Sequence, residues 1–122
     1  MRFMMIVKHA EKQGPPPKPL MDAIAKLAEE DSKKGKMLGS GGLGPTALGA
    51  RVRLSGGQVT VTDGPFTEAK EVVGGYAIVR AATRDEAIAL AQRVVDVHVA
   101  AGVPEFEMEI RPIFDAHEGC AP

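Results

Sequence analysis

Residues 58–66 of the chain read QVTVTDGPF. Valine alternates with threonine in the first half of this segment, which is the period of a half-buried β-strand. The strand then meets Gly64, which can adopt a positive φ, and Pro65, whose ring fixes φ at about −65°. Asp63 can accept hydrogen bonds from the backbone just downstream. The chain is therefore expected to turn here, with one carboxylate at the turn.

A strand pairs with this segment from the upstream side. Residues 49–57 read GARVRLSGG, and the predicted strands at 51–54 and 58–62 are joined through Ser55, Gly56 and Gly57, which is a hairpin signal. Outside the hairpin, strand and helix patterns alternate. Strands are expected at 3–8, 36–38, 76–80 and 105–113, a loop that cannot be helical at 14–19, and helices at 20–34 and 83–101.

The helix ends are marked by local signals. The second helix opens with a capping box at Thr83 and Glu86, and glycines at 35 and 102 end the two helices. The order β-α-β, hairpin, β-α-β predicts an α+β, ferredoxin-like fold, an antiparallel sheet with both helices on one face. We expect a single domain over residues 1–114 and a loose tail at 115–122.

The strand at 3–8 has apolar side chains on both faces. Helices cover only one face of such a sheet, so the other face would expose a large apolar surface in a monomer. We therefore expect a homodimer that packs through this open sheet face.

The hairpin and its turn carry a family resemblance. Residues 67–76, after the turn, read TEAKEVVGGY. In its order of elements over roughly residues 1–114, and most specifically over residues 51–76, the chain resembles the YCII-related family, in particular the subgroup named for its Asp-Gly-Pro-Phe (DGPF) motif. The resemblance implies a ferredoxin-like subunit of a dimeric α/β barrel. It assigns no reaction in most members: some look like enzymes, and others are associated with sigma-factor regulation.

Composition argues against several functions. The net charge is −1, from 15 basic and 16 acidic residues, so no footprint for nucleic acid and no polybasic membrane patch is expected. Tryptophan is absent and tyrosine occurs once, which argues against base-stacking platforms. No apolar run approaches the roughly 20 residues that span a bilayer. The single cysteine, Cys120, cannot form an internal disulfide, so we expect a cytoplasmic protein.

Residues 39–44 read GSGGLG and match the dinucleotide fingerprint G-x-G-x-x-G. That fingerprint needs a helix immediately after it, whereas PTALG and a hairpin follow here. We expect residues 39–49 to form a flexible glycine-rich loop over a pocket. Ser40 and the backbone of Gly41 are then candidates to bind an anionic ligand. No cofactor is expected.

Four residues are candidates for acid–base catalysis: His9, Asp63, Asp96 and His98. His9 ends the first strand beside a proline-rich loop, where either a working residue or a surface histidine is reasonable. His98 lies on an apolar stripe of the second helix, so a histidine satisfied by core or interface contacts is the alternative. Asp96 lies in a segment similar to one where enzyme-like relatives carry an Asp that partners a His of the first helix. Residues 20–34 contain no His.

Charged residues crowd the segment after the hairpin. Paired carboxylates can divide acid and base roles, or can form a solvated cluster that stabilises the turn, and Asp63 and Glu71 are open to both interpretations. Arg51 and Arg53 share one strand face and can bind a carboxylate or face solvent. The candidate ligand-binding set is Ser40, Gly41, Arg53 and Glu71. The three histidines have no metal-binding spacing, and we expect no metal site.

Two functional hypotheses follow. The first is a small-ligand-binding or regulatory protein. The alternative is a cofactor-independent acid–base enzyme, such as a lyase, dehydrohalogenase or isomerase, acting on a small polar or anionic substrate. In both, the pocket is expected between the helix-bearing sheet and the glycine-rich loop, reached by His9, Ser40, Asp63 and the segment 96–98.

Overall fold

A computed structural model of the chain describes residues 1–9, 16–66 and 71–114. The tail predicted at 115–122 lies outside this part. The body contains, in chain order, β1 (Arg2–His9), α1 (Lys18–Lys33), β2 (Met37–Gly42), β5 (Val72–Arg80), α2 (Arg84–Ala100) and β6 (Glu107–Ile113). Between β2 and β5 the chain forms a 3-10 turn, η1 (Thr46–Leu48), and the hairpin strands β3 (Ala50–Ser55) and β4 (Gln58–Asp63).

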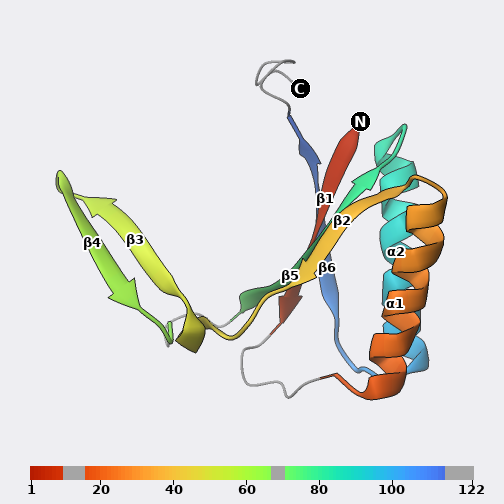
Figure 1. Ribbon diagram of the computed structural model, residues 1–122, viewed down its shortest axis with the longest axis horizontal. Helices are drawn as coiled ribbons and strands as arrows, with labels where there is room; N and C mark the ends of the chain where they lie inside the picture. The colour runs from red at the N-terminus through yellow and green to blue at the C-terminus, as the bar shows by residue number, and fades with distance from the viewer. Residues whose placement is uncertain (10–15, 67–70, 115–122) are drawn as a thin grey trace.

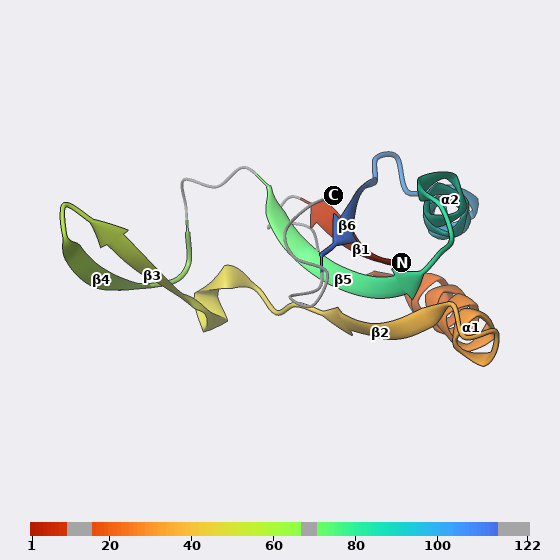
Figure 2. The ribbon, with the colours of Figure 1, turned by 90° about the horizontal axis from the view of Figure 1, so that it is seen from above.

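The main sheet has the strand order β2-β5-β1-β6, and every neighbouring pair is antiparallel. The first strand is thus central, as two split β-α-β units require. Both helices pack on one face of this sheet (Figure 1, Figure 2). The predicted α+β, ferredoxin-like fold is confirmed.

The core lies between the helices and the sheet. Phe3 and Met5 of β1 are buried there against Val79 of β5 and a row of α2 side chains, Ala87, Leu90 and Ala91. Each large apolar side chain buried in this way contributes about 1.5–3 kcal/mol. Met4 and Ile6 alternate with the buried pair and remain partly exposed on the opposite face. The two-sided apolar pattern predicted for this strand is therefore present.

The helix ends follow their capping signals with two adjustments. Thr83 Oγ1 accepts the backbone N–H of Glu86 at 3.1 Å, while Glu86 accepts the N–H of Ala82 at 3.3 Å rather than that of the cap residue itself. Helix α1 begins at Lys18, so the prediction that residues 14–19 cannot be helical is wrong for the last two. Pro19 is tolerated because the first turn of a helix needs no backbone donor.

Two long-range effects were not evident in the sequence. The glycine-rich segment expected as a loop over 39–49 is strand up to Gly42, because the edge of β5 pairs with it despite its poor strand propensity. Val59 and Val61, expected to be half-buried, are exposed, because β3 and β4 pair only with each other and project away from the body (Figure 1). The hairpin itself is confirmed, with positive φ at both turn glycines, Gly56 and Gly57.

Candidate functional site

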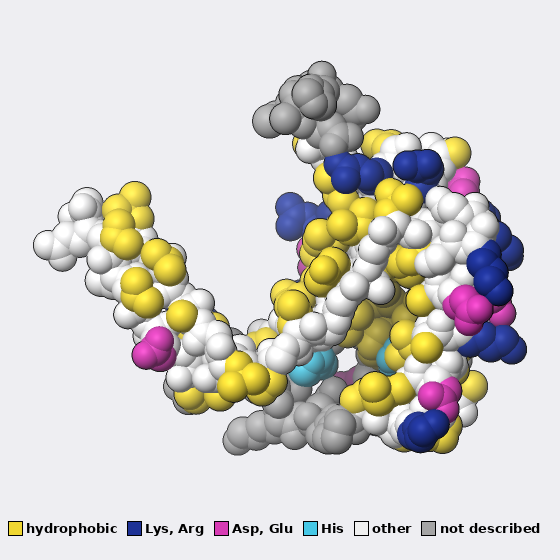
Figure 3. Space-filling model, in the orientation of Figure 1, with side chains coloured by type: hydrophobic (Ala, Val, Ile, Leu, Met, Phe, Trp, Pro, Cys, Tyr) yellow, Lys and Arg dark blue, Asp and Glu magenta, His cyan; other side chains and the backbone are white. Residues whose placement is uncertain are grey.

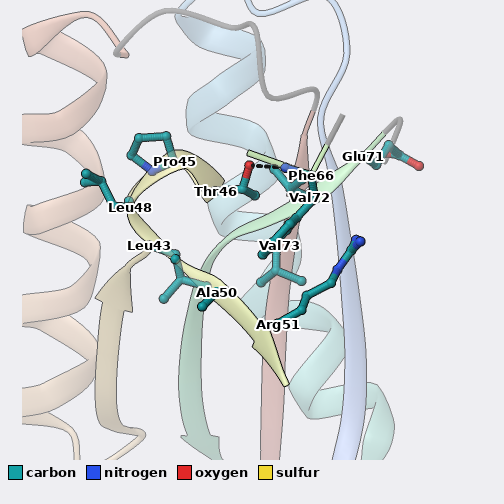
Figure 4. A pocket seen from close by; sticks show the side chains of 12 residues that line it. Leu43, Pro45, Thr46, Leu48, Ala50, Arg51, Phe66, Glu71, Val72 and Val73 are labelled. Carbon is teal, nitrogen blue, oxygen red and sulfur yellow. Dashed lines mark hydrogen bonds between the residues drawn. The ribbon is translucent and has the colours of Figure 1, made fainter. Parts of the chain in front are cut away.

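A hollow of about 500 Å³ lies at the base of the hairpin, between the segment that enters it and the start of β5 (Figure 4). Its lining comes from residues 43–46, 48–51, Phe66 and 71–73. This volume falls within the range of small-molecule pockets. The sequence predicted a pocket between the helix-bearing sheet and the glycine-rich segment, reached by His9, Ser40, Asp63 and residues 96–98. The hollow borders the glycine-rich segment, but none of these predicted residues lines it.

The DGPF turn forms one wall because it is held tightly against η1. The Gly64 N–H donates to the Gly49 carbonyl oxygen at 2.9 Å, and the Phe66 N–H donates to Thr46 Oγ1 at 3.1 Å. A Cβ on Gly64 would overlap the carbonyl oxygen of Thr46, so only glycine fits this approach. We call the contact of Gly64 and Phe66 with Thr46 and Gly49 the turn clamp.

The hollow is polar on one side and apolar on the other. The guanidinium of Arg51 lies over the ring of Phe66, with Cζ 4.1 Å from the ring centroid, which is a cation–π geometry. Figure 4 shows Arg51 and Glu71 on one side and Leu43, Pro45 and Leu48 on the other. The arrangement suits a small molecule with an apolar body and a charged group, and guanidinium groups recognise carboxylates well.

The predicted ligand-binding residues are divided between two places. Glu71 lines the hollow, whereas Arg53 lies farther out along β3 and does not. Ser40 and Gly41 line a second cavity of about 270 Å³ between α1 and the sheet, where glycines form part of the floor. Asp63 ends β4 directly opposite Ala50, which lines the hollow, and its side chain is exposed. The binding roles of these residues stay predictions.

His9 is seated in the sheet near the hollow. It pairs with Val72, a lining residue, and its ring lies against Gly74, where a Cβ would overlap the imidazole. Gly74 is the extra residue of a β-bulge opposite β1, between Val73 and Gly75. The sequence shows the glycine pair of β5 but not its contact with His9, because the bulge that sets this register depends on strand pairing.

Asp96 and His98 lie elsewhere. His98 is buried in α2; its Nδ1 donates to the Val94 carbonyl oxygen at 2.7 Å, and its ring stacks on Phe106 with centroids 3.6 Å apart. These contacts fit the alternative of a histidine satisfied by packing. Asp96 is exposed on α2, and neither residue lines the hollow or the second cavity. Their catalytic roles stay predictions.

Charge also gathers at the end of β1. Lys8 Nζ lies 3.5 Å from Glu107 and 3.6 Å from Glu109, and the negative charges of these two residues, with that of Glu71, raise the pKa of Lys8. The lysine therefore stays cationic at neutral pH. Within the described ranges no group of three or more His, Cys, Asp or Glu residues is placed to hold a metal ion.

These features define a ferredoxin-like α+β domain with an inserted hairpin, whose turn is clamped beside a hollow of small-molecule size. Residues 1–114 match the YCII-related domain, and the chain belongs to that family. It is also 35% identical over 69 residues to an uncharacterized protein of Rhizobium meliloti (strain 1021). The match covers 57% of this chain and 52% of that protein, so it spans about half of the relative's length. Among the described residues, no helix has the length and apolar character needed to span a membrane.

Proposed function

We propose that this chain is a small-molecule-binding protein whose ligand, an apolar body with a carboxylate or similar anionic group, lies in the hollow beside the DGPF turn. The observation that carries the proposal is the position of Arg51. Its guanidinium is held over Phe66 at one side of a hollow of about 500 Å³ whose other side is apolar. A cation beside apolar walls interacts with an anion more strongly than it would in open water.

We also propose that the chain belongs to the DGPF subgroup of the family, forms a homodimer and is cytoplasmic. The DGPF motif and its clamp on Thr46 support membership of the DGPF subgroup of the family. The partly exposed apolar residues on the open sheet face, Met4, Ile6, Tyr76 and Ile78, support a homodimer. The single cysteine supports a cytoplasmic setting. Regulation, including any association with a sigma factor, would then depend on whether the ligand is bound.

A cofactor-independent acid–base enzyme is the second candidate, and the seating of His9 over Gly74 favours it. An imidazole fixed near a ligand site is suited to proton transfer near neutral pH. His9→Gln separates the two candidates. In a binding protein, ligand affinity and any regulatory output survive this change. In an enzyme, the variant still binds but no longer converts the ligand, as NMR of the ligand would show.

Titration with matched ligands tests the binding proposal. The ligands are carboxylates from acetate to 4-phenylbutyrate, each paired with its amide, and binding is followed by thermal shift and calorimetry. The variant is Arg51→Met, which keeps most of the apolar stem. The matched control is Arg53→Met, which removes the same charge from the same strand but outside the hollow.

We expect the longer carboxylates, but not their amides, to stabilise the unsubstituted protein and Arg53→Met. Affinity should fall at least tenfold in Arg51→Met, which corresponds to about 1.4 kcal/mol. Equal carboxylate affinity in the two variants would contradict the proposal, as would equal binding of acids and amides.

A further inference from the structure

One face of the hairpin is an apolar array that no other described segment of the chain covers. The register pairs Val52 with Val61 and Leu54 with Val59, so these four side chains share one face. They are 66–72% exposed. The opposite face carries Arg51, Arg53, Thr60 and Thr62. We call the hairpin the arm, and its four apolar residues the arm array.

An isolated two-stranded hairpin is marginally stable in water, so an arm of this kind needs a surface to pack on. The chain also exposes more surface than its mass predicts. A compact monomer of 12.9 kDa would expose about 6,300 Å², whereas this chain, counting the residues outside the described ranges as well, exposes 8666 Å². The excess is of the order that a stable protein–protein interface buries.

A second uncovered apolar surface faces the same space as the arm. It is the open face of the main sheet, where Met4 pairs with Ile78 and Ile6 with Tyr76. The arm and the body diverge from the base of the hairpin, and apolar side chains are visible on both sides of the space between them (Figure 1, Figure 3). Within the described residues, the arm array is exposed and the open sheet face is partly exposed.

We propose that, when two copies pair, the arm of each copy lies along its partner through the arm array, so that the partner fills this space. Each copy has one arm and one open sheet face, so a two-fold dimer can bury both surfaces of both copies. The arm array has no charged residue, and a net charge of −1 opposes association only weakly. The arms extend the sheet-face dimer proposed above, and they do not depend on ligand binding.

Exchange of valine and threonine between the two faces of β4 provides the test. The interface variant is Val59→Thr with Val61→Thr, which makes half of the arm array polar. The control is Thr60→Val with Thr62→Val on the opposite face of the same strand. All four changes keep a β-branched side chain of similar size, so strand propensity is retained. No core residue is touched, and circular dichroism checks the fold.

The measurements are mass by light scattering across micromolar concentrations and hydrogen exchange of the arm amides. We expect the unsubstituted chain and the control to have twice the 12.9 kDa monomer mass. The interface variant should dissociate at least tenfold more readily, with faster exchange of the arm amides.

Three results would overturn the proposal. The first is that the unsubstituted chain is a monomer. The second is that the arm amides stay protected in a monomer, which would mean that the arm folds onto its own sheet, and the third is that the interface variant dimerises as tightly as the control. In the last case Ile6→Glu shows whether the open sheet face alone holds the dimer. Ligand binding is read separately through Arg51→Met, so failure here leaves the binding proposal intact.

Discussion

Replacing Gly64 with alanine is expected to open the base of the hairpin while the main sheet stays folded. The added Cβ would lie 2.5 Å from the Thr46 carbonyl carbon and 3.2 Å from the Ala47 nitrogen, so the turn has to move away from η1. That movement breaks the hydrogen bonds from Gly64 to Gly49 and from Phe66 to Thr46. Each contributes about 1 kcal/mol, so the local opening free energy should fall by about 2 kcal/mol.

Native-state hydrogen exchange measures this loss directly. A fall of about 2 kcal/mol corresponds to roughly 30-fold faster exchange at the amides of Gly64 and Phe66. Amides of β1 and β5 should be unaffected, because the core cluster contains no residue of the clamp. The variant should also lose affinity for carboxylates, since the turn forms a wall of the hollow.

Gly42→Ala is the matched control. A Cβ at Gly42 meets nothing within 4 Å, and its φ is not positive, so the same substitution is free of overlap there. Exchange at the clamp should be unchanged in this variant. If Gly64→Ala also leaves exchange at Gly64 and Phe66 as it is in the unsubstituted chain, the turn clamp does not hold the hairpin base and the reasoning is refuted.

Three further substitutions test the rest of the structure. Arg93→Met removes the cation that lies 2.6 Å from buried Asp31 and should lower the free energy of urea unfolding by roughly 2 kcal/mol, the scale of a lost hydrogen bond to a charged group. Adding Asp31→Leu should recover most of this loss, because no unpaired carboxylate then stays buried, and no recovery would contradict the pairing. Thr83→Ala should cost about 1 kcal/mol through the lost cap of α2, and an unchanged unfolding midpoint would contradict that role. Glu107, Glu109 and Glu71 raise the pKa of Lys8, so Lys8→Met should have a lower melting temperature than the unsubstituted chain at neutral pH. The difference in melting temperature should disappear as the pH rises through the pKa of Lys8, and a difference that does not change with pH would contradict this role of Lys8.

Much of the fold was predictable because its signals are local. The apolar run of β1, the capping residues of α2 and the two-glycine hairpin turn each depend on a few neighbouring residues. The extension of β2 to Gly42 was not predictable, because glycine has a low strand propensity and only the edge of β5 supplies the pairing. The exposure of Val59 and Val61 was missed for a related reason. Alternating apolar residues predict that one face of a strand is buried. They do not show whether the main sheet and helices of the same chain provide the surface that buries it.

The candidate site was predicted in part. The sequence indicated the turn, Glu71 and a pocket against the glycine-rich segment, because these lie within one continuous stretch. It did not assign Arg51 rather than Arg53 to the hollow, because that choice depends on how far each residue lies from the clamp. It also grouped Ser40 and Gly41 with this pocket, whereas β2 carries them into a second cavity under α1.

The hollow beside the DGPF turn is the central claim, and an amide chemical-shift titration tests it most directly. The protein is labelled with nitrogen-15 and titrated with 4-phenylbutyrate. We predict that the largest shifts fall on residues 43–51, Phe66 and 71–73. Shifts concentrated instead on residues 40–42 and 75–77, the floor of the second cavity, would place the ligand between α1 and the sheet and contradict the account.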